Sequence, residues 1–312
     1  SKEFGDAYKG DYAHFTLKEI YEQHETILKA GEKTEEEIEK AADYIKHAKN
    51  IYITGSGTSY NSALIAKQIF SKYAKIKAEP IMSSELQFAP ESIEENSIVI
   101  ALSQSGESAD VLDAVKIGKQ ANCKIIAIVN LMTSSLAREA DVVIGMNCGP
   151  EIGVAATKSF TSQLVVLYKI VQKLTDGKIT INFEKFAESI IKILENPVKI
   201  QKIAKEMKNI SDIYVLGRGI NYPIAKEAAL KLKELTYIHA EGIPGGELKH
   251  GPLALMDSNV FVIIINPNDS TYSDTLTSAR EIKARGAKII GVSDIESDIY
   301  DYWIEMPKID QV

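Results

Sequence analysis

Two short polar segments of the sequence are rich in groups that bind anions. "SQSGES" at 103–108 follows the apolar run "NSIVIAL", and "TGSGTSYNS" at 54–62 follows the start of "IYITGSG". Each is followed by apolar residues at helical spacing, which predicts a strand, a turn and a helix. The free N–H groups and the dipole at a helix N-terminus suit a dianion such as phosphate. The side chains that would surround it are those of Thr58, Ser59, Ser103, Gln104, Ser105 and Ser108.

The alternative is that these hydroxyls simply cap two ordinary connections. The first segment is not a dinucleotide fingerprint, because Tyr60 stands where the third glycine belongs, and no P-loop lysine follows either segment. A similar stretch recurs later in the chain, where "NPNDSTYS" replaces "SQSGES" and Arg218 replaces Ser56. A polar loop that only one copy retains favours a single bound phosphate.

A second group of reactive side chains lies in "YPIAKEAALKLKELTYIHAEGIPGGELKHGPLAL" at 222–255. Glu227, Lys231 and Glu234 follow one another at i, i+4 and i+7, which places them on one face of a helix. A partly buried carboxylate beside a lysine is suited to act as a general base. The other interpretation is an exposed ion pair that contributes roughly a few tenths of a kcal/mol. The spacing alone leaves both open.

Histidines in the same segment suggest further chemistry. His250 lies in "GGELKHGP", between glycines, which predicts a loop from which it can reach a substrate. His239, Glu241, Glu247 and His250 form H-x-E and E-x-x-H patterns, but H-E-x-x-H and further clustered ligands are missing. We therefore predict no metal site and no cofactor.

An internal duplication supplies the elements that must position these residues. "IYITGSG" at 51–57 returns as "IYVLGRG" at 213–219, and "KIIAIVN" at 124–130 returns as "KIIGVSD" at 288–294. Each copy alternates short apolar runs with amphipathic stretches, which predicts parallel sheets covered by helices on both faces. The predicted fold class is α/β: two tandem doubly wound parallel-sheet domains after an N-terminal helical lead-in.

The expected domains are the lead-in at 1–49, a first domain at 50–180 with the phosphate loops, and a second at 181–312 with the catalytic helix and the histidine loop. The charged run "LTDGKITINFEK" is interpreted as the connection between them. The first copy continues into "ATKSFTSQLVVLYKIVQKL", whereas the second ends at "EMPKIDQV" without a matching helix. This difference predicts that a C-terminal tail is missing.

Composition narrows the class of protein. The 312 residues carry a net charge of −7, which argues against nucleic acid or an anionic membrane as a partner. The sequence has neither an apolar run of spanning length nor a signal-peptide core at its start. Cys123 and Cys148 form neither a disulfide framework nor a zinc pattern. These features predict a cytoplasmic protein.

Longer motifs resemble one family over nearly the whole chain. "KEIYEQ", "GTSYNSA", "SQSGESAD", "EIGVAATKSFTSQL" and the "GRG" to "GELKHGPLAL" stretch are similar to the isomerase part of glucosamine-6-phosphate synthases, which is built from two sugar isomerase (SIS) domains. The resemblance departs at Ser56 and Ala156, where relatives often carry cysteine and serine. The family's glutaminase domain and its C-terminal tail, whose lysine helps ring opening, are absent from this sequence.

The resemblance implies roles for individual residues. The sugar phosphate would be held by Ser59, Ser103, Gln104, Ser105 and Ser108. Thr58 and the backbone near Val154 would touch the sugar hydroxyls. Glu234 would move a proton between C1 and C2, with Lys231 and Glu227 assisting at the oxygens. His250 would open the sugar ring from the neighbouring subunit of a homodimer.

The resemblance also implies the reaction. Fructose 6-phosphate, or its imine, would be converted towards glucosamine 6-phosphate or glucose 6-phosphate in hexosamine biosynthesis. Two alternatives remain open at this point. One is a non-catalytic SIS module that only binds phosphosugars, and the other is a deglycase that acts on fructosyl-amine phosphates.

Overall fold

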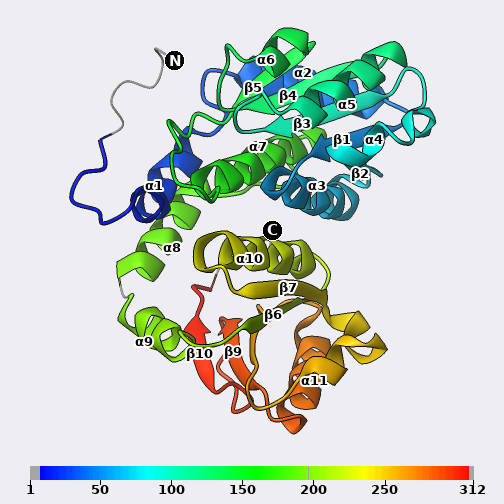
Figure 1. Cartoon of the computed structure of the whole chain (residues 1–312). Coiled ribbons are helices and arrows are strands. Elements are labelled where there is room, and N and C mark those ends of the chain that lie inside the picture. The colour runs from blue at the N-terminus through cyan, green and yellow to red at the C-terminus, as the bar shows by residue number, and fades with distance from the viewer. Residues whose placement is uncertain (1–7, 196, 309–312) are drawn as a thin grey trace. The chain divides into compact units, whose positions relative to one another are not determined.

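Two compact units make up the chain (Figure 1). The computed structural model describes residues 8–195 and 197–308. Unit 1 is described over 8–187, and unit 2 over 188–195 and 197–308. The first seven residues of the predicted lead-in lie outside the described residues. So do residues 309–312, on which the prediction about the end of the chain falls.

Unit 1 is built on a five-stranded parallel sheet with strand order β2-β1-β3-β4-β5. The strands β1 and β3, with the sequences IYITG and IVIALS, are buried throughout, as expected where helices cover both faces. The strands are β1 (Ile51–Gly55), β2 (Glu79–Met82), β3 (Ile98–Ser103), β4 (Lys124–Val129) and β5 (Val142–Gly145).

The helices of unit 1 form two groups around this sheet (Figure 1). One group centres on α7 (Lys158–Leu174), which packs against α1 (Phe15–Lys29), α2 (Glu35–His47) and α3 (Thr58–Ile69). The other centres on α5 (Ala109–Gln120), which packs against α4 (Ser83–Leu86), α6 (Ser135–Glu139), β3 and β4. A π-helical turn, Phe70–Ala74, extends α3, and a 3₁₀ turn, Pro90–Ser92, precedes β3. The predicted helical lead-in contains α1 and α2.

Unit 2 has a second five-stranded parallel sheet, with strand order β10-β9-β8-β6-β7. Its strands are β6 (Asp212–Gly217), β7 (His239–Pro244), β8 (Phe261–Ile265), β9 (Lys288–Ser293) and β10 (Tyr302–Glu305). Helix α10 (Asn221–Thr236) packs against β6 and β7, and α11 (Tyr272–Ala284) packs against β9. The remaining elements are α8 (Phe183–Glu195), α9 (Val198–Glu206) and the 3₁₀ helices η3 (Gly245–His250) and η4 (Pro252–Leu255).

The two sheets have the same topology when their strands are numbered within each unit. In both, the first strand lies between the second and the third, and the fourth and fifth follow the third. The duplication in the sequence is thus a duplication of fold, and the predicted α/β class with two parallel sheets is confirmed. Within the described ranges, no helix has both the length and the apolar character needed to cross a membrane.

Two local details differ from the sequence-based expectations. The predicted connection, which ends at residue 185, already contains the first turn of α8, and α9 follows before β6 begins. His250 does not lie in an irregular loop, because residues 245–250 form the 3₁₀ helix η3. This segment begins with Gly245 and Gly246 and is followed by Gly251, and a short 3₁₀ helix satisfies its hydrogen bonds locally, from i to i+3.

Candidate functional site

The polar loop between β3 and α5 is held by its own serines. Ser103 ends β3 and is buried, and its Oγ accepts a hydrogen bond from the Gly106 N–H at 3.0 Å. Ser105 is exposed, and its Oγ accepts from the Glu107 N–H at 3.2 Å. Ser108 is the N-cap residue of α5. The loop therefore brings serine hydroxyls to the N-terminus of a twelve-residue helix, where the dipole favours an anion.

Helix α6 braces this loop from its other side. Gly106 has a φ of +66°, and a Cβ built on it would lie 2.2 Å from Ser134 Oγ. The Leu136 N–H donates to the Gly106 carbonyl at 3.0 Å, and the Ser135 N–H donates to Glu107 Oε1 at 2.7 Å. Only glycine accepts both the left-handed backbone and the close approach of Ser134.

The second polar loop connects β1 to α3. Gly57, with a φ of +54°, is the N-cap residue, and Thr58 is the first residue of α3. Because β1 and β3 are adjacent parallel strands, this loop and the 103–108 loop leave the same edge of the sheet side by side. The structure thus brings together, in unit 1, the six residues predicted to surround a phosphate: Thr58, Ser59, Ser103, Gln104, Ser105 and Ser108.

A buried glutamine that the sequence did not single out orients one of these hydroxyls. Gln163 lies on α7, is 1% exposed, and its Nε2 donates to Ser59 Oγ at 2.9 Å. A serine oxygen that accepts from an amide keeps its own proton available for an acceptor such as a phosphate oxygen. Gln163 belongs to the quoted "EIGVAATKSFTSQL" motif, but only the packing of α7 on α3 shows its partner.

The reactive residues of unit 2 form one ionic group on α10. Lys231 Nζ lies 3.2 Å from Glu227 Oε1 and 2.6 Å from Glu234 Oε2. Glu227 is 5% exposed, and the Oε2 atom of Glu234 is inaccessible to solvent. We call these three residues the α10 triad.

The burial of Glu227 argues against the interpretation as a fully exposed ion pair. An exposed ion pair would leave both partners solvated, whereas Glu227 lies among the buried residues of α10, which include Ala225 and Ala229. One ammonium is shared by two carboxylates. Glu227 is buried, whereas the side chains of Lys231 and Glu234 are 19% and 31% exposed, so the group is partly shielded from water, where charge interactions are stronger than at a surface. Such a group can hold a carboxylate ready to accept a proton.

The histidines of unit 2 lie on other elements. His250 is the exposed last residue of η3, and the neighbouring Lys249 Nζ is paired with Glu281 at 2.8 Å. His239 Nδ1 lies 2.9 Å from Asp212 Oδ1 at the start of β7. Across the part of the chain that the structure describes, no three His, Cys, Asp or Glu side chains gather as metal ligands would.

Val154 lies on the segment between β5 and α7 and is 84% exposed. Glu151, on the same segment, caps the start of α7, because its Oε1 accepts from the N–H groups of Thr157 at 2.9 Å and Ser159 at 3.1 Å.

Cys148 lies nearby and is buried. Burial, and secondarily the charge of Glu151, raises the pKa of the Cys148 thiol to about 12, so this cysteine is not a nucleophile near neutral pH.

Comparisons with known proteins agree with this architecture. The SIS domain model matches residues 44–172 and 206–301, which together make up well over half of the chain. The chain is 40% identical over 319 residues to the glutamine–fructose-6-phosphate aminotransferase [isomerizing] of Thermococcus kodakarensis, an alignment of 98% of this chain and 53% of that protein. The protein of the same name from Pyrococcus horikoshii is also 40% identical, with 97% and 52% covered. The chain thus spans about half the length of the curated relatives it matches.

A solved structure matches over nearly its full length. It is the C-terminal domain of glucosamine-fructose-6-phosphate aminotransferase from Francisella tularensis, which is 36% identical and has a TM-score of 0.85. The alignment covers 96% of this chain and 91% of that domain. Together with the two matched ranges of the family model, this similarity shows that the chain belongs to the SIS domain family.

Proposed function

We propose that this chain is a sugar-phosphate aldose–ketose isomerase unit that acts on fructose 6-phosphate in hexosamine biosynthesis. The observation that carries the proposal is the α10 triad, in which Glu234 lies 2.6 Å from Lys231 and a buried Glu227 holds the same ammonium. The names of its relatives, aminotransferases of the isomerizing type, support the same reaction class.

The proposal assigns substrate binding to unit 1. The phosphate would be bound by the side chains and helix N-termini at the ends of β1 and β3, through Ser59, Ser103, Gln104, Ser105 and Ser108. Thr58 and the backbone near Val154 would contact the sugar hydroxyls. Anchoring the phosphate fixes the distance from it to C1 and C2, and such orientation is a large part of what an isomerase must provide.

Proton transfer is assigned to unit 2. The Glu234 carboxylate would remove a proton from C1 of the ring-opened ketose, while an acid on the oxygen side protonates the C2 carbonyl oxygen and gives a cis-enediol. Return of the proton to C2 and loss of the O1 proton would complete the aldose. Lys231 and Glu227 would serve the oxygen side, since an ammonium between two carboxylates can give a proton and recover it.

The test is Glu234→Gln, which keeps the size of the side chain and removes its basicity. We expect exchange of the C1/C2 proton with solvent to fall by about 10²–10⁴-fold, the usual contribution of a general base. Binding of fructose 6-phosphate should be retained. Exchange is followed by NMR in deuterated water. The role of Lys231 is tested with Lys231→Met. Lys233→Met is the control, because Lys233 is an exposed residue of the same helix.

Three outcomes separate the candidate functions. Conversion of fructose 6-phosphate to glucose 6-phosphate supports the isomerase. Tight binding of fructose 6-phosphate without conversion identifies a phosphosugar-binding module. Release of amine from fructosyl-amine phosphates, without conversion of fructose 6-phosphate, identifies a deglycase. Undiminished proton exchange in Glu234→Gln removes Glu234 from the role of base.

We extend the proposal to a homodimer in which His250 of one copy opens the sugar ring bound by the other. The exposure of His250 at the end of η3 is compatible with such a role. Mixing Glu234→Gln with His250→Ala chains would then restore activity, because heterodimers contain one intact set of residues, about one site in four overall for random pairing. If both variants are inactive alone and their mixtures stay inactive, His250 and Glu234 belong to the same chain's site. A His250→Ala chain that is active by itself removes His250 from the site.

A further inference from the structure

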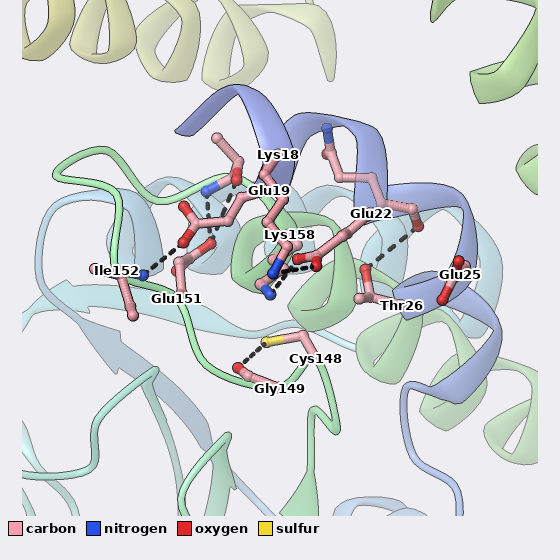
Figure 2. Close-up of polar contacts among 12 residues, drawn as sticks. Lys18, Glu19, Glu22, Glu25, Thr26, Cys148, Gly149, Glu151, Ile152 and Lys158 are labelled. Atoms are coloured by element: carbon pink, nitrogen blue, oxygen red, sulfur yellow. Dashed lines mark hydrogen bonds and ion pairs between the residues drawn. The ribbon is translucent and has the colours of Figure 1, made fainter. Parts of the chain in front are cut away.

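The exposed segment that carries Val154 is fastened to α1 by a buried carboxylate (Figure 2). Glu19, at 2% exposed, accepts hydrogen bonds at Oε1 from the Ile152 N–H at 2.5 Å and from the Gly153 N–H at 3.0 Å. Its Oε2 also lies 3.1 Å from the Gly153 nitrogen. A single side chain thus takes up two consecutive backbone donors of the segment, with the charge-assisted bonds that are stronger than neutral ones.

A side chain at position 153 would require Glu19 and Thr16 to move. A Cβ on Gly153 would lie 2.4 Å from Glu19 Oε2 and 2.6 Å from Thr16 Oγ1. Two features of the sequence, a glycine in "EIGVAATKS" and an acidic residue in "KEIYEQ" more than 130 positions earlier, are therefore parts of one contact. Neither Glu19 nor Gly153 has a role that the family resemblance implies.

An ion pair connects the end of the same segment to the next turn of α1. Lys158, the first residue of α7, has a side chain only 4% exposed, and its Nζ lies 2.6 Å from Glu22 Oε2. Figure 2 shows Glu19 and Glu22 reaching from α1 towards Ile152 and Lys158. Together with the Glu151 bonds to the start of α7, these contacts hold the segment on both sides of Val154.

We propose that Glu19 is a positioning residue that fixes the backbone at Val154 for contact with the sugar. Because the Ile152 and Gly153 N–H groups point to Glu19, the segment turns Val154 outward to solvent. This inference rests on the proposed function. Under it, the "KEIYEQ" motif contributes to binding of the sugar and not of the phosphate. The hydrogen bonds from Ile152 and Gly153 offset the desolvation cost of the buried carboxylate. Glu19 therefore holds the segment in one conformation before substrate binds.

The experiment uses the full chain and two variants that loosen the contact from opposite sides. Glu19→Gln removes the charge but keeps the size, and Gly153→Ala pushes the segment away by a clash. The matched control is Glu25→Gln on the same helix, where Glu25 forms an exposed pair with Lys29. We expect both variants to raise KM for fructose 6-phosphate about tenfold with little change in kcat, since the contact acts on ground-state and transition-state binding alike.

Two further measurements separate positioning from a general loss of structure. The affinity for inorganic phosphate should be unchanged in both variants, because the phosphate loops end other strands. The amide protons of residues 152 and 153 should exchange with solvent faster than in the wild type. An unchanged KM in both variants, or equal losses for inorganic phosphate and fructose 6-phosphate, overturns the assignment. A wild-type chain that neither binds nor converts fructose 6-phosphate overturns the proposed function and this assignment with it.

Discussion

Two glutamates that pair with lysines, Glu22 and Glu234, lie in different surroundings. Glu22 joins α1 to the start of α7, where Lys158 is almost fully buried. Glu234 belongs to a pair whose lysine already has a second carboxylate, Glu227. Glu22 is paired with two lysines, because Lys18 Nζ also lies 3.1 Å from its Oε1. The group around Glu22 therefore has an ammonium in excess, whereas the α10 triad has a carboxylate in excess.

The Glu22 pair makes the stability of the chain depend on pH. Partial burial opposes ionisation of Glu22, but hydrogen bonds from Lys158 and Lys18 outweigh it and hold its pKa below 4.5 in the folded state. A lowered folded-state pKa contributes stability that is present above the unfolded value and is lost as pH falls through the folded value.

Glu22→Gln should therefore unfold more easily than the wild type at pH 7, by about 1–3 kcal/mol, because Lys158 loses a charged partner in a buried setting. The difference should shrink as pH falls below 4.5, where Glu22 in the wild type becomes protonated too. Urea unfolding at a series of pH values measures this. Glu25→Gln serves as the control, and a difference that does not change with pH would show that the ion pair contributes nothing.

Much of the site was predictable at this scale because polar residues at strand ends stand out against apolar runs. The serines of 103–108 and the i, i+4, i+7 spacing of the α10 triad were both visible in the sequence. Gln163 and Glu19 were not singled out, since a glutamine or a glutamate on an amphipathic helix looks like a surface residue until the helix is packed. Their partners, Ser59 and Gly153, are more than 100 positions away.

At the scale of elements, the repeated apolar runs predicted β1, β4, β6 and β9, whose first residues agree with the starts of those runs to within one position. The strands that such runs did not single out, β2 and β7, are the edge strands paired to β1 and β6. Both contain exposed or half-buried residues and a proline, so neither has the continuous apolar run of a central strand. They form because the neighbouring strand supplies hydrogen-bond partners, which local sequence does not reveal.

The placement of α10 on the sheet depends on one such edge strand. Gly242 in β7 lies so close to the helix that a Cβ would be 2.7 Å from the Cα and nitrogen of Lys226. Gly242→Ala should push α10 away from β7 and destabilise unit 2 by about 2 kcal/mol, as overpacking commonly does.

Under the proposed function, the same variant should lose turnover while its affinity for inorganic phosphate stays unchanged, because α10 carries Glu234 and the phosphate loops belong to unit 1. Thermal unfolding and the proton-exchange assay measure the two effects. Gly246→Ala is the control for stability, since the nearest atom to its added Cβ is the end of Arg218 at 3.9 Å. A Gly242→Ala chain as stable as the wild type would show that α10 adjusts without cost.

At the scale of the whole molecule, the repeat predicted two domains of one topology, because duplicated sequence implies duplicated fold. What the repeat could not predict is how the polar residues of the two copies diverged. Unit 1 keeps hydroxyls at the ends of its strands, whereas unit 2 has Arg218 there and places its ionic group along α10. The two units differ here in a few side chains while their fold is the same, so the fold does not determine these differences.

Separate cores predict separate unfolding. Unit 1 has a buried cluster around Val99, Ile125 and Val129, and unit 2 has its own around Val262, Ile264 and Ile289. In unit 2, Gly291 lets the ring of Tyr300 lie on β9, where an added Cβ would come within 2.4 Å of it. Gly291→Ala should therefore weaken the core of unit 2 by about 1–3 kcal/mol and leave the core of unit 1 intact.

Amide hydrogen exchange tests this on the full chain. In Gly291→Ala the amides of β8 and β9 should exchange faster, while those of β3 and β4 keep their wild-type protection, because local stability follows the contacts of each cooperative unit. Inorganic phosphate should still bind, since the proposed phosphate loops follow β1 and β3. If β3 and β9 lose protection together and to the same extent, the two sheets form one cooperative unit, and the duplication has fused two folds into a single folding domain.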